Sequence, residues 1–442
     1  MRRWLAAVPL VLSLAVTPPA VLPANAAPAV VPAAAAAVPP GKRATIGGYQ
    51  VVWLKGTPYE MGYQHGMLLH DKLKAGHETI QWNPTLRLML MIAQSQGLIA
   101  LAKDNCYPTT LQEIEGFLAA TKDIGWTMDE CLALNFGDMI AEFVRVGTPD
   151  ADKLVTPGCS QFVATGAATA DGRLYHGRLL DWVKIDFILE NPVIFVREPK
   201  DGIPHATIGF PGNVAPFSGI NAAGVTIASN EATPRDKNVD RRKGRSHVQM
   251  LSRILGESHS LAEARAFIKS EPHMTCDIFT ITDGNTKEAS VFEMAPDHIG
   301  ERRLTDGVVF TSNHFLAPET AALDREPVNP SSRRRFERLG QLLSPQVSGS
   351  LYGKLTPLGM VNIMRDRVDP WTGKTSPLSE FDDACSLATN GALYAILFDP
   401  EARKFWVAMG KIPVPTQPFV GFSLTELLQG PQAAALMPAA MP

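Results

Sequence analysis

The sequence predicts a layered domain of the α/β or α+β class, in which β-sheets are covered by helices. Between residues 58 and 146, apolar residues recur at the spacing of amphipathic helices. From about Cys159 onward, short β-branched and aromatic runs bounded by Gly, Asp or Asn take over, which is typical of strands. Helical stretches interrupt these strand runs, and such alternation indicates sheets with helices packed on them.

The individual elements follow from the same two periodicities. Helices are expected in the first part of the chain at residues 59–73, 83–96, 110–124 and 128–143. Strands are expected at residues 160–165, 174–179, 192–196, 225–229, 277–282, 289–294, 308–311, 392–398 and 404–408. The helices that interrupt them are expected at residues 244–255, 261–270 and 333–343.

Residues 1–26 have the three parts of an export signal in the right order. Two arginines follow Met1, an apolar run covers residues 5–16, and Ala24-Asn25-Ala26 offers a small-residue cleavage site. The apolar run is too short to anchor the chain in a bilayer. We therefore expect a periplasmic or secreted protein.

Both ends of the predicted domain border segments of biased composition. Residues 27–45 are rich in Ala and Pro, which predicts a linker, and residues 429–442 predict a low-complexity tail. Beyond the signal, the longest apolar stretch, residues 88–102, is interrupted by polar residues and Gly97. No membrane span is therefore expected.

Composition and missing motifs exclude several classes of protein. The 41 basic and 44 acidic side chains give a net charge of −3, which argues against a nucleic-acid partner. The hydrophobic content of 45% excludes a wholly disordered chain. No G-x-S-x-G elbow occurs, which argues against a serine α/β-hydrolase. Neither an H-E-x-x-H motif nor a C-x-x-C pair occurs, so no metal site is expected, and we expect no cofactor.

Cys159 is the most unusual of the five cysteines, because it follows Gly158 where helices give way to strands. An odd number of cysteines in an exported protein indicates either intermolecular pairing or a reactive thiol. Asp171-Gly172 predicts a hairpin turn that brings Arg178 and Asp181 back beside Cys159. A positive charge favours the thiolate and a carboxylate can orient its proton carrier. The alternatives are a buried strand cysteine and an ion pair at a strand end.

Several blocks of this sequence, in this order, resemble one enzyme family. They are Gly56-Thr-Pro-Tyr-Glu60-Met-Gly62, Gly158-Cys159, Arg178-x-x-Asp181-Trp182, Gly219-Ile-Asn221-Ala-Ala-Gly224, Ser312-Asn313-His314-Phe315 and Ser332-Arg-Arg-Arg335-Phe336. The chain is similar in them to cysteine N-terminal-nucleophile hydrolases. Within these it resembles the autoproteolytic acyl-coenzyme A:isopenicillin N (6-aminopenicillanic acid) acyltransferase-like family, which is related to the choloylglycine hydrolases.

The resemblance implies an α+β fold, the αββα four-layer sandwich of these hydrolases. One domain would be cut at Cys159 into a helical pro/α-chain segment, residues 46–158, and a β-chain, residues 159–428, which stay associated. The resemblance also implies roles for three residues. Asn221 would be the oxyanion-hole asparagine, Asn313 a second active-site asparagine, and Arg335 an active-site arginine, with Arg333, Arg334 and Arg338 as alternatives to Arg335.

The chemistry that Cys159 could perform follows from its position. Its thiol can attack the carbonyl of Gly158, and hydrolysis of the thioester would free the Cys159 α-amine as a general base. The mature thiolate would then take the acyl group of a small N-acylated molecule, with water or an amine as acceptor, or with an acyl-CoA as donor. A dipeptidase or phospholipase-like hydrolase of the same superfamily, and a non-catalytic periplasmic solute-binding protein, remain alternatives.

Overall fold

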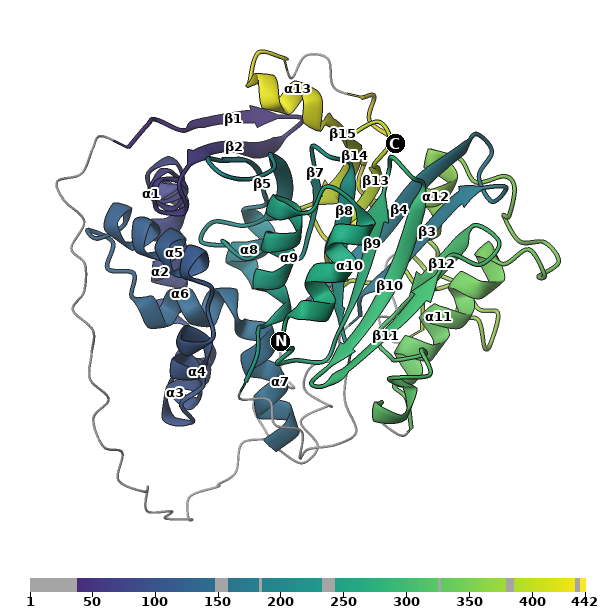
Figure 1. The fold of residues 1–442 in the computed structure, drawn as a ribbon, viewed down its shortest axis with the longest axis horizontal. Coiled ribbons are helices and arrows are strands. Elements are labelled where there is room, and N and C mark those ends of the chain that lie inside the picture. The colour runs from purple at the N-terminus through teal and green to yellow at the C-terminus, as the bar shows by residue number, and fades with distance from the viewer. Residues whose placement is uncertain are drawn as a thin grey trace. The chain divides into compact units, whose positions relative to one another are not determined.

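Sheet A is a nine-stranded sheet with the strand order β1-β2-β5-β6-β7-β8-β9-β10-β11 (Figure 1). The structure is a computed structural model that describes residues 38–147, 158–182, 185–232, 243–324, 327–378, 385–433 and 438–442. The strands of sheet A are β1 Lys42–Ile46, β2 Tyr49–Gly56, β5 Val193–Pro199, β6 His205–Gly209, β7 Ser218–Asn221, β8 Val225–Glu231, β9 Asp277–Asp283, β10 Glu288–Ala295 and β11 His298–Arg303. Neighbouring strands are antiparallel except β2 and β5, which are parallel.

Sheet B is an antiparallel sheet of six strands in the order β12-β3-β4-β13-β14-β15. Its strands are β3 Ser160–Gly166, β4 Gly172–Asp181, β12 Val308–Thr311, β13 Ala392–Asp399, β14 Lys404–Met409 and β15 Val420–Ser423. Its central strands are strongly apolar, and every residue of β13 is buried. This continuous burial requires packing on both faces of the sheet.

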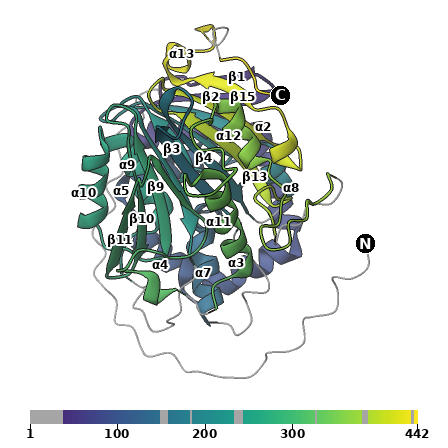
Figure 2. The same cartoon turned by 90° about the vertical axis from the view of Figure 1, so that its right-hand side faces the viewer.

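Helices lie on the outer faces of the two sheets (Figures 1 and 2). The helices of the first part of the chain are α1 Pro58–Leu68, α2 His70–Trp82, α3 Pro84–Ser95, α4 Leu98–Asp104, α5 Pro108–Ala120, α6 Met128–Asn135 and α7 Gly137–Gly147. Those of the second part are α8 Asp186–Glu190, α9 His247–Glu257, α10 Leu261–Ser270, α11 Pro330–Leu343, α12 Pro357–Met364 and α13 Leu424–Gln429, with 3₁₀ turns Ala321–Leu323 and Val414–Thr416.

The buried side chains divide into layers that match this arrangement. Ile194 of sheet A and Phe398 of sheet B belong to the largest buried cluster, which fills the space between the sheets and extends around Phe195 to helices α1 and α5. Ile227 and Ile281 of sheet A pack with α9 and α10 in a second core. The other face of sheet B packs on α11 and α12 in a third cluster, which contains Leu397 of β13 and Leu339 of α11. The order helix, sheet, sheet, helix confirms the predicted α+β, αββα architecture.

Most predicted elements are confirmed, with small shifts of their ends. The predicted helix over residues 128–143 is two helices, α6 and α7, because α6 ends at Phe136. There the Asn135 side chain donates to the Cys131 and Gly212 carbonyl oxygens and accepts from the Val214 backbone amide (2.8 Å). This asparagine therefore ties the end of α6 to the loop before β7.

The segments at the two ends of the domain need correction. The predicted export signal, residues 1–26, lies outside the described residues. The predicted linker, residues 27–45, already includes strand β1, and the predicted helical segment, residues 46–158, contributes β2 to sheet A. The predicted tail includes the end of α13, and Met441 exchanges backbone hydrogen bonds with Phe419. The described parts of both segments, β1, the end of α13 and Met441, therefore belong to the folded domain.

In the described residues, no individual helix has both the length and the apolar composition needed to cross a membrane. The pair α3 and α4 meets those two requirements only when taken together, and it is bent by 69°.

Candidate active site

The β3–β4 hairpin places Cys159 beside Asp181, as the sequence predicts. Ser160 pairs with Leu179 across the hairpin, so Cys159, directly before β3, lies opposite Leu180. The Cys159 thiol donates to the Asp181 carbonyl oxygen, with 3.7 Å between sulfur and oxygen. Cys159 is 4% exposed and belongs to the core between the two sheets.

Gly158 packs directly on the Asp181 carboxyl group. A Cβ atom added to Gly158 would lie 2.1 Å from Asp181 Oδ2 and 2.8 Å from its Cβ and Cγ atoms. Real contacts of this kind are not shorter than about 3 Å, so a larger residue does not fit unless Asp181 or the backbone moves. Asp181 is itself 6% exposed. The carboxyl group therefore abuts the residue that precedes the thiol.

Arg335 reaches the same peptide segment from helix α11. Its Nη1 donates to the carbonyl oxygen of Cys159 and to Ser160 Oγ (3.0 Å). Its Nη2 donates to Asn313 Oδ1 (2.9 Å). The side chain is fully buried, and this burial lowers the pKa of Arg335, whereas the negative charges of Asp181 and Cys159 oppose that shift.

The structure therefore selects Arg335 from the four arginines of its segment. Arg333 and Arg334 lie against the ring of Trp371, and Arg338 pairs with Asp366 (2.7 Å). The selection follows the helix period, because residues four apart lie on one face. On α11, that face carries Ser331, Arg335, Leu339 and Leu343, all of them buried.

Arg178 lies between the sheets and does not contact the thiol directly. Its Nε donates to Ser218 Oγ (2.7 Å), and its other nitrogens donate to the carbonyl oxygens of Leu179 and Ser229. The guanidinium carbon lies 5.8 Å from the centre of the Tyr394 ring. This buried cation thus connects β4 of sheet B to β7 and β8 of sheet A.

Asn313 belongs to the site, whereas Asn221 does not join it. Asn313 accepts from Arg335 and donates to the Glu231 carbonyl oxygen at 2.7 Å. Asn221 donates both amide hydrogens to backbone oxygens at the end of α9, those of Leu255 (3.0 Å) and Ser258 (2.8 Å). Its own oxygen accepts from the Val225 backbone amide. The oxyanion role expected for Asn221 is therefore corrected, because this side chain serves the β7–β8 turn.

Asn230 is a site residue that the sequence analysis missed. It lies on β8, 1% exposed, and donates to the Ser312 carbonyl oxygen at 2.8 Å. Its oxygen accepts from Gln161 Nε2 at 2.6 Å. The available signal was its position directly after the predicted strand 225–229, since polar residues at strand ends are candidates for function.

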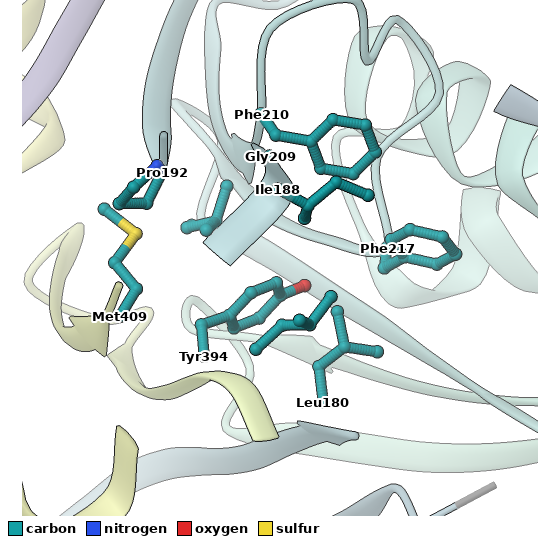
Figure 3. Close-up of a pocket in the computed structure, with 10 residues that line it drawn as sticks. Leu180, Ile188, Pro192, Gly209, Phe210, Phe217, Tyr394 and Met409 are labelled. Carbon is teal, nitrogen blue, oxygen red and sulfur yellow. The ribbon is translucent and has the colours of Figure 1, made fainter. Parts of the chain in front are cut away.

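A small apolar cavity of about 20 Å³ lies between the two sheets near the hairpin (Figure 3). Such a volume holds about one water molecule. The cavity is lined by Leu180, Ile188, Pro192, Ile208, Gly209, Phe210, Phe217, Leu393, Tyr394 and Met409. The Tyr394 hydroxyl is the one polar side-chain group in this lining. Within the described ranges, no group of three or more His, Cys, Asp or Glu residues is placed to hold a metal ion.

The αββα sandwich is the fold of the N-terminal-nucleophile hydrolases. Residues 187–412, just over half of the 442-residue chain, match the family of acyl-coenzyme A:6-aminopenicillanic acid acyl-transferase. The chain therefore belongs to this family. Cys159, Arg178 and Asp181 precede the matched segment.

One curated relative and three solved structures are similar to the chain over part of its length. The relative, an uncharacterized protein of Archaeoglobus fulgidus, is 23% identical over 319 residues, which are 64% of this chain. The alignment covers 53% of that relative, so the chain spans about half of the relative's length.

The three solved structures each have a TM-score of 0.39 to this chain. The Caenorhabditis elegans ortholog of N-acylethanolamine-hydrolyzing acid amidase is 11% identical and covers 55% of this chain and 93% of its own. A mutant conjugated bile acid hydrolase from Clostridium perfringens is 14% identical and covers 60% and 92%. Penicillin V acylase from Agrobacterium tumefaciens is 13% identical and covers 61% and 87%.

Proposed function

We propose that this protein is an exported, self-processing amidohydrolase or acyltransferase of small N-acylated molecules, with Cys159 as its nucleophile. The observation that carries the proposal is the convergence of buried groups on the Gly158–Cys159 peptide bond. Asp181 abuts Gly158, and Arg335 holds the Cys159 carbonyl oxygen. Charged side chains are rarely buried at one peptide bond without a chemical role.

Self-processing begins with attack of the Cys159 sulfur on the carbonyl carbon of Gly158. The bond from that carbon to the Cys159 nitrogen breaks, the nitrogen takes up the thiol proton, and a thioester links Gly158 to the sulfur. Water then hydrolyses the thioester, which releases the Gly158 carboxylate and restores the thiol. The product has a free α-amine on Cys159, whose ordinary pKa of about 7.7–8.0 suits a general base near neutral pH.

In the mature enzyme, the same sulfur attacks the carbonyl carbon of an N-acyl substrate. The α-amine of Cys159 takes the thiol proton and returns it to the leaving amine when the C–N bond breaks. Asp181 is positioned to accept a hydrogen bond from the α-ammonium, because it already abuts residue 158. Water resolves the acyl thioester in a hydrolase; an amine does so in an acyltransferase, in which an acyl-CoA supplies the acyl group.

The apolar cavity beside Leu180 is the proposed site for the acyl group. Leu180 lies opposite Cys159 in the hairpin and also lines the cavity. At about 20 Å³ the cavity is smaller than an acyl chain, so its unbranched wall residue Met409 has to move when substrate binds. An uncharged, apolar acyl group fits this lining best.

After cleavage the two chains are expected to stay together. The first chain contributes β1 and β2 to sheet A, where β2 pairs along its whole length with β5 of the second chain. Trp53 of β2 also donates to the Leu427 carbonyl oxygen near the other end of the sequence (2.6 Å). Separation would break this sheet. The proposal of export depends on residues 1–26 alone.

Intact mass measurement of the purified protein tests the proposal. We expect a cut between Gly158 and Cys159 that Cys159→Ala abolishes and the control Cys106→Ala leaves in place, since Cys106 lies at the end of α4. An uncut wild-type chain, or full activity in Cys159→Ala, would refute it. Competing N-acyl amide, dipeptide and phospholipid substrates then separate the amidase from the dipeptidase and phospholipase-like alternatives.

A further inference from the structure

Tyr394 is the polar residue of the apolar cavity that the proposed mechanism does not yet use. It lies on β13, directly across from Leu180 of β4. Strand β4 pairs with β13 along one edge and with β3 along the other, and Cys159, directly before β3, lies opposite Leu180. Cys159, Leu180 and Tyr394 therefore form a row across sheet B. Side chains paired across neighbouring strands point to the same face of a sheet. All three belong to the core between the sheets, so thiol and phenol face the same space.

The Tyr394 hydroxyl is connected to a buried cation through one serine. Its oxygen lies 2.8 Å from Ser218 Oγ, and Ser218 Oγ accepts a hydrogen bond from Arg178 Nε at 2.7 Å. When Ser218 directs its own hydrogen to the tyrosine oxygen, the phenolic hydrogen is released toward the cavity. The Arg178 charge polarises this chain of hydrogen bonds and makes the phenol a stronger donor.

The electrostatics of the tyrosine agree with this geometry. Burial raises the pKa of Tyr394, while the positive charge of Arg178 and the hydrogen bond with Ser218 oppose the rise. An electrostatic interaction with Cys159 raises the pKa of Tyr394 further. The hydroxyl therefore stays protonated at neutral pH and can donate.

We propose that Tyr394 is a catalytic residue that donates a hydrogen bond to the substrate's carbonyl oxygen as the thiolate of Cys159 attacks. This inference rests on the proposed function. The carbonyl oxygen gains negative charge when the C–S bond forms, and the phenol stabilises it without giving up its proton. When the intermediate collapses, the oxyanion's electron pair re-forms the C=O bond, the C–N bond breaks, and the leaving amine takes the proton that the Cys159 α-ammonium returns. The side-chain amide of Asn221 cannot supply this donor, because both its hydrogens are held by backbone oxygens.

Tyr394→Phe tests the inference, because it removes the hydroxyl and keeps the ring. We expect kcat to fall about 10²- to 10³-fold, as when one oxyanion donor is removed, and KM to change less than about threefold. Tyr175→Phe is the matched control: its hydroxyl donates to Asp171 at the turn of the hairpin (2.7 Å), and kcat should stay within about twofold.

A second readout separates an oxyanion donor from a merely structural tyrosine. An aldehyde inhibitor that carries the substrate's acyl group in place of the amide forms a hemithioacetal with the Cys159 thiol. This adduct mimics the negatively charged tetrahedral intermediate. Its Ki should rise in Tyr394→Phe by the same factor as kcat/KM falls. If kcat stays within threefold of wild type, or if the aldehyde Ki does not move, Tyr394 is not the donor.

The proposed function and the Tyr394 role fail in different ways. Alkylation of the thiol and intact mass report whether each variant is folded, cut and nucleophilic, whatever the state of residue 394. If Cys159→Ala is active, the proposed function fails. If Tyr394→Phe does not mature, Ser218→Ala takes its place, because it removes the Ser218 hydrogen bond to the phenol, weakens the coupling to Arg178 and leaves the hydroxyl. A fall in kcat of about tenfold is then expected, and no fall overturns the proposal.

Discussion

Gly158→Ala addresses the contact on which the proposed self-cleavage depends most directly. The added methyl group would lie 2.1 Å from Asp181 Oδ2, and Asp181 is too buried to swing into solvent. The precursor has to relax by moving either the carboxyl group or the backbone at residue 158, which takes the carbonyl carbon away from the sulfur. A methyl group that overpacks a well-packed site costs about 1–3 kcal/mol.

This strain adds to the activation free energy of self-cleavage, because the variant has to return the Gly158 carbonyl carbon to the Cys159 sulfur before the attack. Since about 1.36 kcal/mol corresponds to a tenfold change in rate, cleavage should slow by about 5- to 150-fold. The assay is a time course of intact mass and gel bands after synthesis, in which the precursor is replaced by the two chains. The thermal stability of the precursor should change little, because the strain is relieved by the local shift.

Gly137→Ala is the control for this experiment. Gly137 begins α7, and no atom lies within 4 Å of the position that its Cβ would take, so an alanine fits there without strain. The control should be cut at the wild-type rate. If Gly158→Ala is also cut at the wild-type rate and at the same bond, the packing of Asp181 on residue 158 does not govern cleavage.

Three further predictions concern the surroundings of the site. Arg335→Ala should lower the free energy of unfolding, measured in urea titrations, by about 3–5 kcal/mol, because it leaves buried acceptors without a donor. The Arg333 side chain is 55% exposed, so the control Arg333→Ala should change that free energy by no more than about 0.5 kcal/mol. Asn221→Ala should cost about 1–3 kcal/mol of stability and leave kcat within threefold; a hundredfold fall in kcat would restore its oxyanion role. Burial lowers the pKa of His176 to about 3, so this ring stays neutral in the native state while the unfolded chain takes up a proton below about pH 6.5. The free energy of unfolding should therefore fall as the pH drops from 6.5, by roughly 1 kcal/mol per pH unit for this residue. His176→Gln should flatten that slope, whereas His259→Gln, at an exposed histidine, should leave it unchanged. Equal slopes in the two variants would contradict a buried, neutral His176.

The part of the site that is local in sequence could be predicted from the sequence alone. The turn at Asp171-Gly172 fixes the pairing of β3 with β4, and the register then brings Asp181 to Cys159. Hairpin pairing needs no knowledge of the remaining fold, because the turn and the alternation of side chains determine it. The hairpin accordingly puts the backbone carbonyl of Asp181 next to the thiol and its carboxyl group next to Gly158, whereas a functional role for the carboxylate stays a prediction.

The distant parts of the site could not be derived in this way. Arg335 and Asn313 reach the hairpin through the packing of α11 on sheet B and the pairing of β12 with β3. Sequence motifs indicate Arg335 and Asn313 only by resemblance to a family. They do not show whether Asn221, in a turn, or Asn230, at the end of the following strand, belongs to the site. Which asparagine bonds to the segment that carries Asn313 depends on how the two sheets stack, which no local pattern encodes.

The strands β1 and β2 were missed for a different reason. The run Val51–Leu54 is continuously apolar and buried, and a run of four apolar residues does not distinguish a strand from part of a helix. Its partner β5 comes more than a hundred residues later, and the pairing is parallel. Parallel pairs need long crossover connections and leave no hairpin signal in the sequence.

This parallel pair changes the meaning of the boundary that the sequence places near residue 150. A boundary between helical and strand-rich segments normally marks two domains, each with its own core. Here one continuous buried cluster contains Leu54 and Phe117 from before the boundary together with Phe195 and Phe398 from after it. The first segment also supplies β1 and β2 at the edge of sheet A, so neither segment has a complete core alone. A cut at Gly158 can therefore free the Cys159 amine while sheet pairing and the shared core hold both chains in one domain.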